Sequence, residues 1–357
     1  MPGEAQSYKA TEEHVKIIGR TCYYNDALWL ALSGGGVEFA LYGKKAEVVL
    51  RGDQTADGGD QFARIGIYVN GERVVDDLMN KPLKTYTVFE SDTEQEVTVR
   101  IIKLSEAAMS TVGIQEIKGS AKAGIRPAPE KVHKIEFIGD SITCGYGVDD
   151  DNELHPFSTA TEDVTKAYAY LTAQALRADY SMVAYSGYGI ISGYTVNGHK
   201  LTTHLLPDYY DKAAKSEGRF DGTLDPLTLG WDFNRFVPDL IVINLGTNDD
   251  SYTQDDPAKQ AEYAGQYTRF LKQVRARNPQ AKLLCTLGIM GDRLYPCVEQ
   301  AVSNYSEETG DRNIAVMKFD VQLASDGYAA DWHPSAATHA KAAEKLTAYI
   351  KELMKWQ

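Results

Sequence analysis

The sequence contains no run of 18 or more apolar residues, and its N-terminal segment lacks the basic start and apolar stretch of a signal peptide. These absences predict a cytoplasmic protein that makes no contact with a membrane, although a secreted form whose leader had been removed would look the same. Basic residues are also scarce, since 37 Lys and Arg stand against 50 Asp and Glu, for a net charge of -13. Because nucleic-acid binding requires clustered cations that neutralise phosphates, the composition argues against a nucleic-acid partner.

Cysteine is rare, with four residues in a chain of 357. The four are Cys22, Cys144, Cys285 and Cys297. They form no Cys-x-x-Cys pair and no zinc-binding pattern, which excludes a disulfide scaffold, so we interpret them as reduced packing residues. With 43% hydrophobic residues and no low-complexity segment, the chain is expected to be globular and to have room for about two domains.

Short segments with alternating apolar and polar residues dominate the chain as far as residue 118. The five clearest are Val37–Leu41, Ala46–Leu50, Ile65–Val69, Thr85–Phe89 and Glu96–Ile101. This pattern is typical of β-strands, and Asn70-Gly71 supplies the residues that a tight hairpin turn needs. Residues 1–120 are therefore predicted to form an all-β sandwich or jelly-roll domain.

The segment from Gly119 to Pro129 is poor in core-sized residues and holds two prolines. This composition favours a linker at residues 121–131, followed by a second domain at 132–357.

After the predicted linker, short apolar segments alternate with helical patterns. The predicted strands lie at Ile135–Ile138, Ser181–Tyr185, Leu240–Leu245, Leu283–Leu287 and Ile314–Met317, and the predicted helices at Lys166–Ala178, Ala258–Arg277, Leu294–Glu308 and Ala336–Lys355. Such alternation predicts a doubly wound α/β domain with a parallel sheet. In these sheets ligands bind at the carboxyl ends of the strands, so the residues directly after each strand are the candidates for chemistry.

Four such strand ends carry reactive or hydrogen-bonding groups. They are Gly139-Asp140-Ser141, Ser186-Gly187-Tyr188-Gly189, Gly246-Thr247-Asn248-Asp249 and Asp331-Trp332-His333-Pro334. A serine hydroxyl becomes a nucleophile when an adjacent imidazole takes its proton, which assigns Ser141 and His333 these two roles. The N–H groups of Ser141 and Gly187 and the amide of Asn248 are then candidates for an oxyanion hole.

Asp331 is the candidate third member of the catalytic group. In an extended segment the side chains of Asp331 and His333 would point to the same side, so the carboxylate would orient the imidazole. Asp140 is expected to cap the turn that carries the serine. Gly189 is a rival of Gly187 for the oxyanion, and Cys144 is a weaker candidate nucleophile than Ser141.

Together these motifs resemble the conserved blocks of SGNH (GDSL-type) hydrolases, and the β-sandwich placed before them resembles carbohydrate esterase family 2. The resemblance implies a flavodoxin-like doubly wound domain, no cofactor, and deacetylation of plant polysaccharides or oligosaccharides such as xylan and glucomannan. It also implies that Ser141 is the nucleophile, His333 the base, and Gly187 and Asn248 oxyanion donors. The broad pattern has Asp three residues before His, whereas the gap here is two, and some family members use a backbone carbonyl to hold the imidazole. Whether the Asp331 carboxylate or a carbonyl orients His333 therefore stays open.

Three aromatic residues near the motifs, Trp332, Trp231 and Tyr188, are candidates to bind sugar, since aromatic faces suit pyranose rings, but each also suits packing. No metal site is predicted, because the spacings of His155, His199 and His204 match no metal motif. The acidic residues Asp249, Asp250, Asp255 and Asp256 are interpreted as caps of the following helix rather than as a cation site.

The sequence therefore predicts a serine esterase that removes acetyl groups from polysaccharide or oligosaccharide through an acetyl-Ser141 intermediate. Two alternatives remain: a lipase or thioesterase acting on longer acyl chains, and a carbohydrate-binding protein with a vestigial site. Association of the chain into a homo-oligomer is left open.

Overall fold

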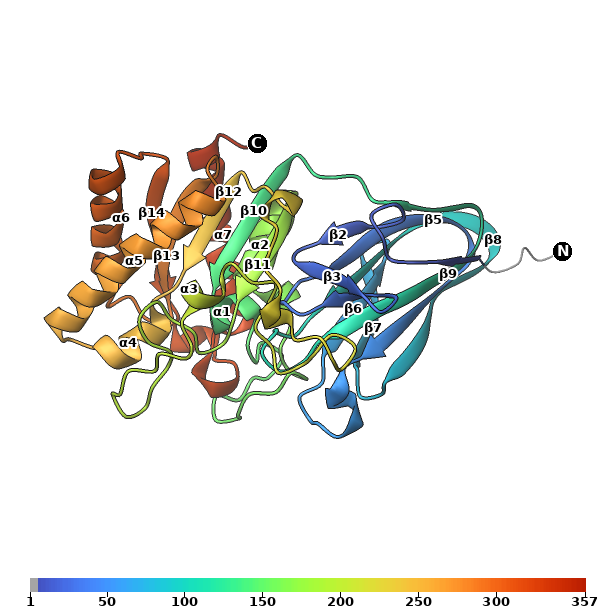
Figure 1. Cartoon of the computed structure of the whole chain (residues 1–357), viewed down its shortest axis with the longest axis horizontal. Coiled ribbons are helices and arrows are strands. Elements are labelled where there is room, and N and C mark those ends of the chain that lie inside the picture. The colour runs from blue at the N-terminus through green and yellow to red at the C-terminus, as the bar shows by residue number, and fades with distance from the viewer. Residues whose placement is uncertain (1–5) are drawn as a thin grey trace. The chain divides into compact units, whose positions relative to one another are not determined.

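The computed structural model describes residues 6–357, with residues 120–123 described by their backbone only. The chain divides into two compact units, whose segments can be followed by colour in Figure 1. The first, here named the β unit, comprises residues 6–130, 158–162 and 212–231. The second, the α/β unit, comprises Lys131–Phe157, Asp163–Asp211 and Asp232–Gln357.

Within residues 6–357, the β unit contains one nine-stranded antiparallel sheet. Its strands are β1 (Gln6–Tyr8), β2 (Lys16–Ile18), β3 (Thr21–Tyr24), β4 (Ala27–Leu30), β5 (Gly36–Gly52), β6 (Arg64–Val69), β7 (Glu72–Leu78), β8 (Leu83–Lys103) and β9 (Val112–Pro127). The order along the sheet is β3-β4-β9-β5-β8-β6-β7, with β1 paired to β9 and β2 paired to β5. The prediction of an all-β first domain is confirmed.

Two pairs of predicted strands are single long strands in the structure. Val37–Leu41 and Ala46–Leu50 both lie in β5, and Thr85–Phe89 and Glu96–Ile101 both lie in β8. The polar residues between the segments continue the backbone pairing, and register shifts in β5 mark the irregular positions. Such bulges bend a strand, so the sheet curls around one apolar core.

The boundary between the domains also differs from the prediction. Residues 121–127, expected to form part of a linker, extend β9, which pairs with β5 as far as Pro127. Small side chains do not prevent a backbone from pairing, so low core content alone was a poor signal for a linker. In addition, residues 158–162 and 212–231 belong to the β unit, although they lie within the sequence predicted as the second domain.

The α/β unit contains a five-stranded parallel sheet in the order β11-β10-β12-β13-β14. The strands are β10 (His133–Gly139), β11 (Ala178–Ala184), β12 (Leu240–Asn244), β13 (Lys282–Ile289) and β14 (Ile314–Val321). Because β10 is followed along the sheet by β11 on one side and β12 on the other, the strand order reverses at β10. This order is that of a flavodoxin-like doubly wound fold, as predicted, and the reversal creates a crevice at the carboxyl ends of these strands.

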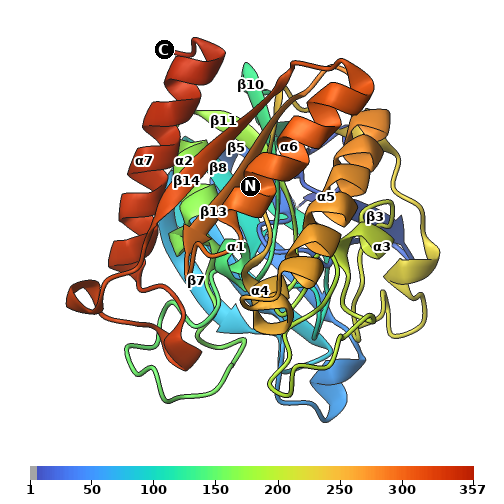
Figure 2. The ribbon, with the colours of Figure 1, turned by 90° about the vertical axis from the view of Figure 1, so that its left-hand side faces the viewer.

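The helices are α1 (Ser141–Cys144), α2 (Tyr168–Ala175), α3 (Leu206–Tyr209), α4 (Thr247–Thr253), α5 (Pro257–Arg277), α6 (Tyr295–Thr309) and α7 (Ala336–Met354). Figure 2 shows α2 and α7 side by side on one face of the sheet and α5 and α6 on the other. Helix α7 buries Ala342, Leu346 and Ile350, three positions of its predicted apolar stripe. Among the described residues, no helix combines the length and apolarity needed to span a membrane.

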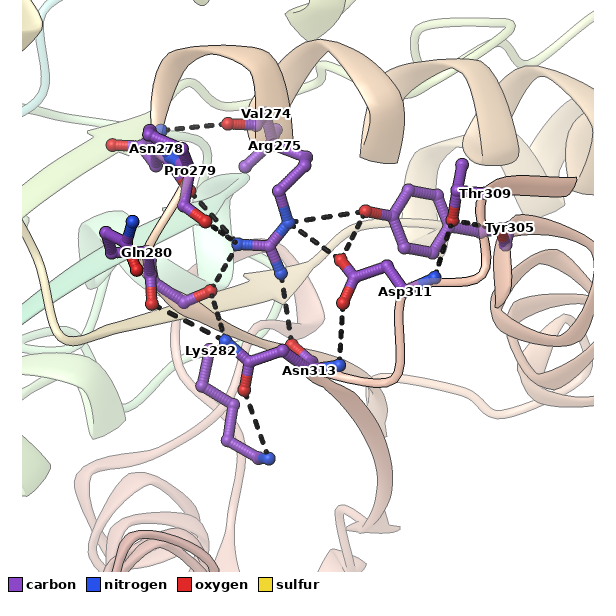
Figure 3. Close-up of polar contacts among 11 residues, drawn as sticks. Val274, Arg275, Asn278, Pro279, Gln280, Lys282, Tyr305, Thr309, Asp311 and Asn313 are labelled. Carbon is purple, nitrogen blue, oxygen red and sulfur yellow. Dashed lines mark hydrogen bonds and ion pairs between the residues drawn. The ribbon is translucent and has the colours of Figure 1, made fainter. Parts of the chain in front are cut away.

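At the amino ends of β13 and β14, one arginine joins several segments of the chain (Figure 3). The Arg275 guanidinium, near the end of α5, donates to the Asp311 carboxylate at 2.8 Å and to the Ala281 carbonyl at 2.5 Å. It also donates to the Asn313 carbonyl at 3.1 Å, and Tyr305 donates to the same Asp311 oxygen at 2.6 Å. These bonds fix the turns that lead into β13 and β14, two neighbouring strands of the sheet.

Candidate active site

Ser141 lies directly after β10, at the start of the short helix α1. The carboxylate of Asp140 caps this helix by accepting the N–H of Ile142 at 3.0 Å, which confirms the predicted capping role. As the first residue of α1, Ser141 has a main-chain N–H with no acceptor inside the helix. The side chain is buried, so its hydroxyl lies in surroundings that exclude most water.

His333 lies before α7 and contacts the serine. Its Nε2 is 2.9 Å from Ser141 Oγ, although the two residues are 192 positions apart in the sequence. Its Nδ1 is 3.0 Å from the main-chain carbonyl oxygen of Asp331. Because a carbonyl only accepts, Nδ1 carries the proton in this contact, which leaves Nε2 unprotonated and facing the hydroxyl.

The Asp331 carboxylate does not orient the imidazole, so that prediction is wrong. Asp331 and Trp332 both have left-handed backbone conformations, with φ of 52° and 61°. The segment is therefore a tight turn instead of the extended chain assumed from the sequence, and the turn directs the Asp331 carbonyl to the ring. The carboxylate instead accepts the hydroxyl of Tyr146 at 3.2 Å.

The protonation state of His333 suits a base. Burial lowers its pKa to about 4, and the nearby carbonyl and charge of Asp331 oppose this shift only in part. The imidazole is therefore neutral at pH 7 and able to accept a proton.

Gly187 and Asn248 follow the two strands that flank β10. Gly187 has φ of +80°, a conformation that favours glycine, and its N–H donates to no acceptor among residues 6–357. The rival Gly189 donates its N–H to the His204 carbonyl at 3.1 Å and is therefore occupied. Asn248 is buried in the first turn of α4, where its amide nitrogen donates to the Tyr188 carbonyl at 2.8 Å and to the Asp140 carboxylate at 3.4 Å.

Asp249 has a role that the sequence analysis missed. Its buried carboxylate accepts the main-chain N–H groups of Ile190, Ile191 and Ser192 at 2.7 to 3.1 Å. Burial raises its pKa to about 6, against these hydrogen bonds, which favour the charged form. Asp249 thus anchors the loop that contains Gly187 and Tyr188 instead of capping a helix in solvent. A carboxylate directly after Asn248 was the only signal in the sequence.

The other members of the acidic cluster have ordinary roles. Asp256 caps α5, as predicted, by accepting the N–H of Ala258 at 2.9 Å. Asp250 and Asp255 lie 3.3 and 3.5 Å from the guanidinium of Arg293. The four cysteines form no disulfide, and Cys144 is buried.

The three aromatic candidates for substrate binding have different surroundings. Trp332 is half exposed beside His333 and contacts Tyr328, with 5.2 Å between ring centroids. Tyr188 is buried against other rings. Trp231 belongs to the β unit, where it packs beneath the guanidinium of Arg20. Trp332 is thus the exposed aromatic candidate, and it directly precedes His333 in the turn.

Two segments of the chain match known families. Residues 137–341 match the GDSL-like lipase/acylhydrolase family, and residues 17–129 match the carbohydrate esterase 2 N-terminal family.

Individual relatives extend these matches over most of the chain. The cellulase/esterase CelE of Acetivibrio thermocellus is 33% identical over 331 residues, covering 91% of this chain but only 38% of CelE. An acetylxylan esterase / glucomannan deacetylase of Cellvibrio japonicus is 28% identical over 357 residues, covering 97% of this chain and 91% of that protein. The solved structure of a family two carbohydrate esterase from Clostridium thermocellum, in complex with cellohexaose, has a TM-score of 0.81 at 30% identity, covering 96% of this chain and 100% of that one.

A doubly wound sheet with serine, glycine, asparagine and histidine at its strand ends is the arrangement of the GDSL-like class, and the match over residues 137–341 agrees with it. Within that class, the chain belongs to carbohydrate esterase family 2. The resemblance inferred from the sequence is confirmed.

Proposed function

We propose that this chain is a serine esterase that removes O-acetyl groups from carbohydrate. The observation that carries the proposal is the 2.9 Å contact between His333 Nε2 and Ser141 Oγ at the carboxyl end of a doubly wound sheet. A neutral imidazole at this distance from a serine hydroxyl is the arrangement that nucleophilic acyl transfer requires.

In the acylation step, Ser141 Oγ attacks the acetyl carbonyl carbon while its proton moves to His333 Nε2. The imidazolium that forms keeps its Nδ1–H on the Asp331 carbonyl. Negative charge collects on the former carbonyl oxygen, which the N–H groups of Ser141 and Gly187 would bind. The amide of Asn248 would be the third donor, exchanging its long 3.4 Å bond to the Asp140 carboxylate for one to this oxygen while it keeps its bond to Tyr188.

Collapse of this intermediate breaks the bond to the sugar oxygen, which takes the proton from His333 Nε2 and leaves as a hydroxyl. Water then enters, gives a proton to Nε2 and attacks the acetyl-Ser141 carbonyl carbon. Release of acetate, with return of the proton to Ser141 Oγ, restores the site. Every group in both steps comes from the chain or from water.

The substrate class is proposed from the relatives and from the exposed surface of the site. A relative named acetylxylan esterase / glucomannan deacetylase aligns with 97% of this chain, which supports an acetylated hemicellulose substrate. The half-exposed Trp332 would offer an apolar face to a pyranose ring beside His333. A neutral acetylated sugar is also compatible with a chain of net charge -13.

The test measures acetate release from acetylated xylan and glucomannan oligosaccharides, in parallel with hydrolysis of nitrophenyl acetate and octanoate. We expect the parent to release acetate and Ser141→Ala to lose this activity. Ser303→Ala, which removes an exposed hydroxyl bonded to Glu307 in α6, is the matched control and should behave as the parent.

Other results would contradict the proposal. Hydrolysis of octanoate alone would favour the lipase or thioesterase alternative. Binding of oligosaccharide by the parent without any turnover would favour the carbohydrate-binding alternative.

A further inference from the structure

The turn that carries the Asp331 carbonyl is a conformationally unfavourable one. Asp331 and Trp332 are consecutive residues with positive φ, and a bulky side chain such as that of Trp332 disfavours this conformation. The turn nevertheless determines where His333 Nδ1 finds its acceptor. Contacts outside the turn must therefore hold it in place.

Several of these contacts come from the segment that follows the nucleophile. The Asp331 N–H donates to the His155 carbonyl at 3.0 Å. Gly147 approaches the turn so closely that a Cβ at this position would lie 2.6 Å from Ala330 Cβ. The third contact is the hydrogen bond from the Tyr146 hydroxyl to the Asp331 carboxylate, at 3.2 Å.

Tyr146 also contacts the base itself. Its ring is stacked on the imidazole of His333, with 3.7 Å between centroids and 17° between planes. Phe157 packs on Tyr146, at 4.7 Å between centroids. The main-chain N–H of Tyr146 donates to the Ser141 carbonyl at 3.2 Å, so one residue touches the turns of both the nucleophile and the base.

This arrangement favours the transition state over the ground state. When His333 accepts the serine proton, the imidazolium lies against the face of an aromatic ring, which attracts cations. The Asp331 carboxylate, held by the same tyrosine, adds a negative charge near the ring. Neither attraction is present to the same degree while the imidazole is neutral, so both act on the barrier.

We propose that Tyr146 is a positioning residue for the esterase reaction. Its ring covers the imidazole of His333, and its hydroxyl donates to the Asp331 carboxylate. The carboxylate therefore affects His333 by holding Tyr146 in place. The proposal rests on the function proposed above. Asp331 then has two separate roles: its main-chain carbonyl accepts from His333 Nδ1, and its carboxylate accepts from the Tyr146 hydroxyl.

The test is a double-mutant cycle on this hydrogen bond. Tyr146→Phe keeps the ring and removes the hydroxyl, and Asp331→Ala removes the carboxylate. We expect each to lower kcat about tenfold with KM within about twofold, and the double variant to be no slower than the slower single variant. Asp331→Asn still offers an oxygen that accepts the hydroxyl but carries no charge, so it should recover part of the activity lost in Asp331→Ala.

Two controls separate positioning from folding. Tyr349→Phe removes another tyrosine hydroxyl, which donates to the Val316 carbonyl in the same unit, and should leave kcat unchanged. Tyr146→Leu removes the stacked ring as well and should lower kcat further than Tyr146→Phe. Thermal unfolding of every variant shows whether the fold is retained.

Labelling of Ser141 by a fluorophosphonate distinguishes failure of this inference from failure of the proposed function. The probe reacts only with an activated serine and requires no sugar. If the parent neither labels nor turns over, the proposed function fails. If the parent labels and Tyr146→Phe labels equally fast, if the two substitutions are additive, or if only KM rises, then Tyr146 does not position the base.

Discussion

The two ends of the parallel sheet in the α/β unit differ in how well their polar groups are satisfied. At the amino ends of β13 and β14, the Arg275 guanidinium donates to a carboxylate and to carbonyls from several segments (Figure 3). At the carboxyl ends, Gly187 keeps an N–H without an acceptor in residues 6–357, and Asp331 and Trp332 have left-handed backbones. His333 is buried there with a lowered pKa.

This difference indicates that the two ends contribute differently to the protein. Donors without acceptors and unfavourable backbone conformations cost stability, and they persist where the surrounding structure imposes them. In the proposed reaction, the residues at the carboxyl end supply the base, the nucleophile and the oxyanion donors. We therefore expect substitutions at the carboxyl end to change mainly the rate of reaction, and those at the amino end to change mainly the free energy of unfolding.

The largest effect is expected for His333→Gln. Glutamine fills similar space but has no basic nitrogen, so kcat should fall by about 10⁴-fold or more while the fold is retained. Ester hydrolysis and thermal unfolding are measured together. His199→Gln, at an exposed loop position, is the control and should match the parent. Retention of a tenth of the parent activity would remove His333 from the mechanism.

The next effect is expected for Asn248→Ala, which removes one of the proposed oxyanion donors. Loss of such a donor typically lowers kcat by about 10²- to 10³-fold, with little change in KM. Steady-state kinetics on an acetyl ester measure both constants. Asn304→Ala, in the exposed part of α6, is the control. A rise in KM at constant kcat would mean that Asn248 binds the substrate and not the transition state.

At the opposite end, Arg275→Met should lower the free energy of unfolding by about 3 kcal/mol, because it leaves Asp311 and several carbonyls without their donor. Urea unfolding measures this loss, and kcat of the folded variant should stay near the parent value. Lys272→Met, which breaks an exposed pair with Glu308, should change stability by less than about 0.5 kcal/mol. A large loss of kcat with unchanged stability would contradict the expectation that the amino ends of the strands affect stability and the carboxyl ends affect the reaction.

The smallest effect is in the pH profile. Because burial lowers the pKa of His333 to about 4, kcat/KM should stay level from pH 7 down to about 5 and fall as the pH passes through 4. The value of kcat/KM falls at low pH because the imidazole acts as a base only when it is unprotonated. A half-maximal point near 6.5 would indicate an exposed imidazole, and one near 6 would indicate protonation of Asp249.

Much of the fold was predictable because its signals are local. Alternation within each segment predicted the strands, and the 3.6-residue period predicted α5, α6 and α7 closely. The lengths of β5 and β8 and the assignment of residues 212–231 to the β unit were not predicted. These features depend on backbone pairing and on contacts between segments distant in sequence, which leave no periodic pattern.

The same contrast between local signals and contacts of distant segments applies to the candidate active site. The sequence by itself determined the reactive residue types and their placement after strands, and parallel strands bring their carboxyl ends together, so Ser141, Gly187, Asn248 and His333 followed. Only the tertiary structure decided that Gly189 is occupied, that the carbonyl of Asp331 faces the imidazole, and that Tyr146 lies on His333. The reason is physical: two left-handed residues rotate the peptide plane of Asp331, and contacts with segments distant in sequence, such as Tyr146 and His155, help to hold that conformation.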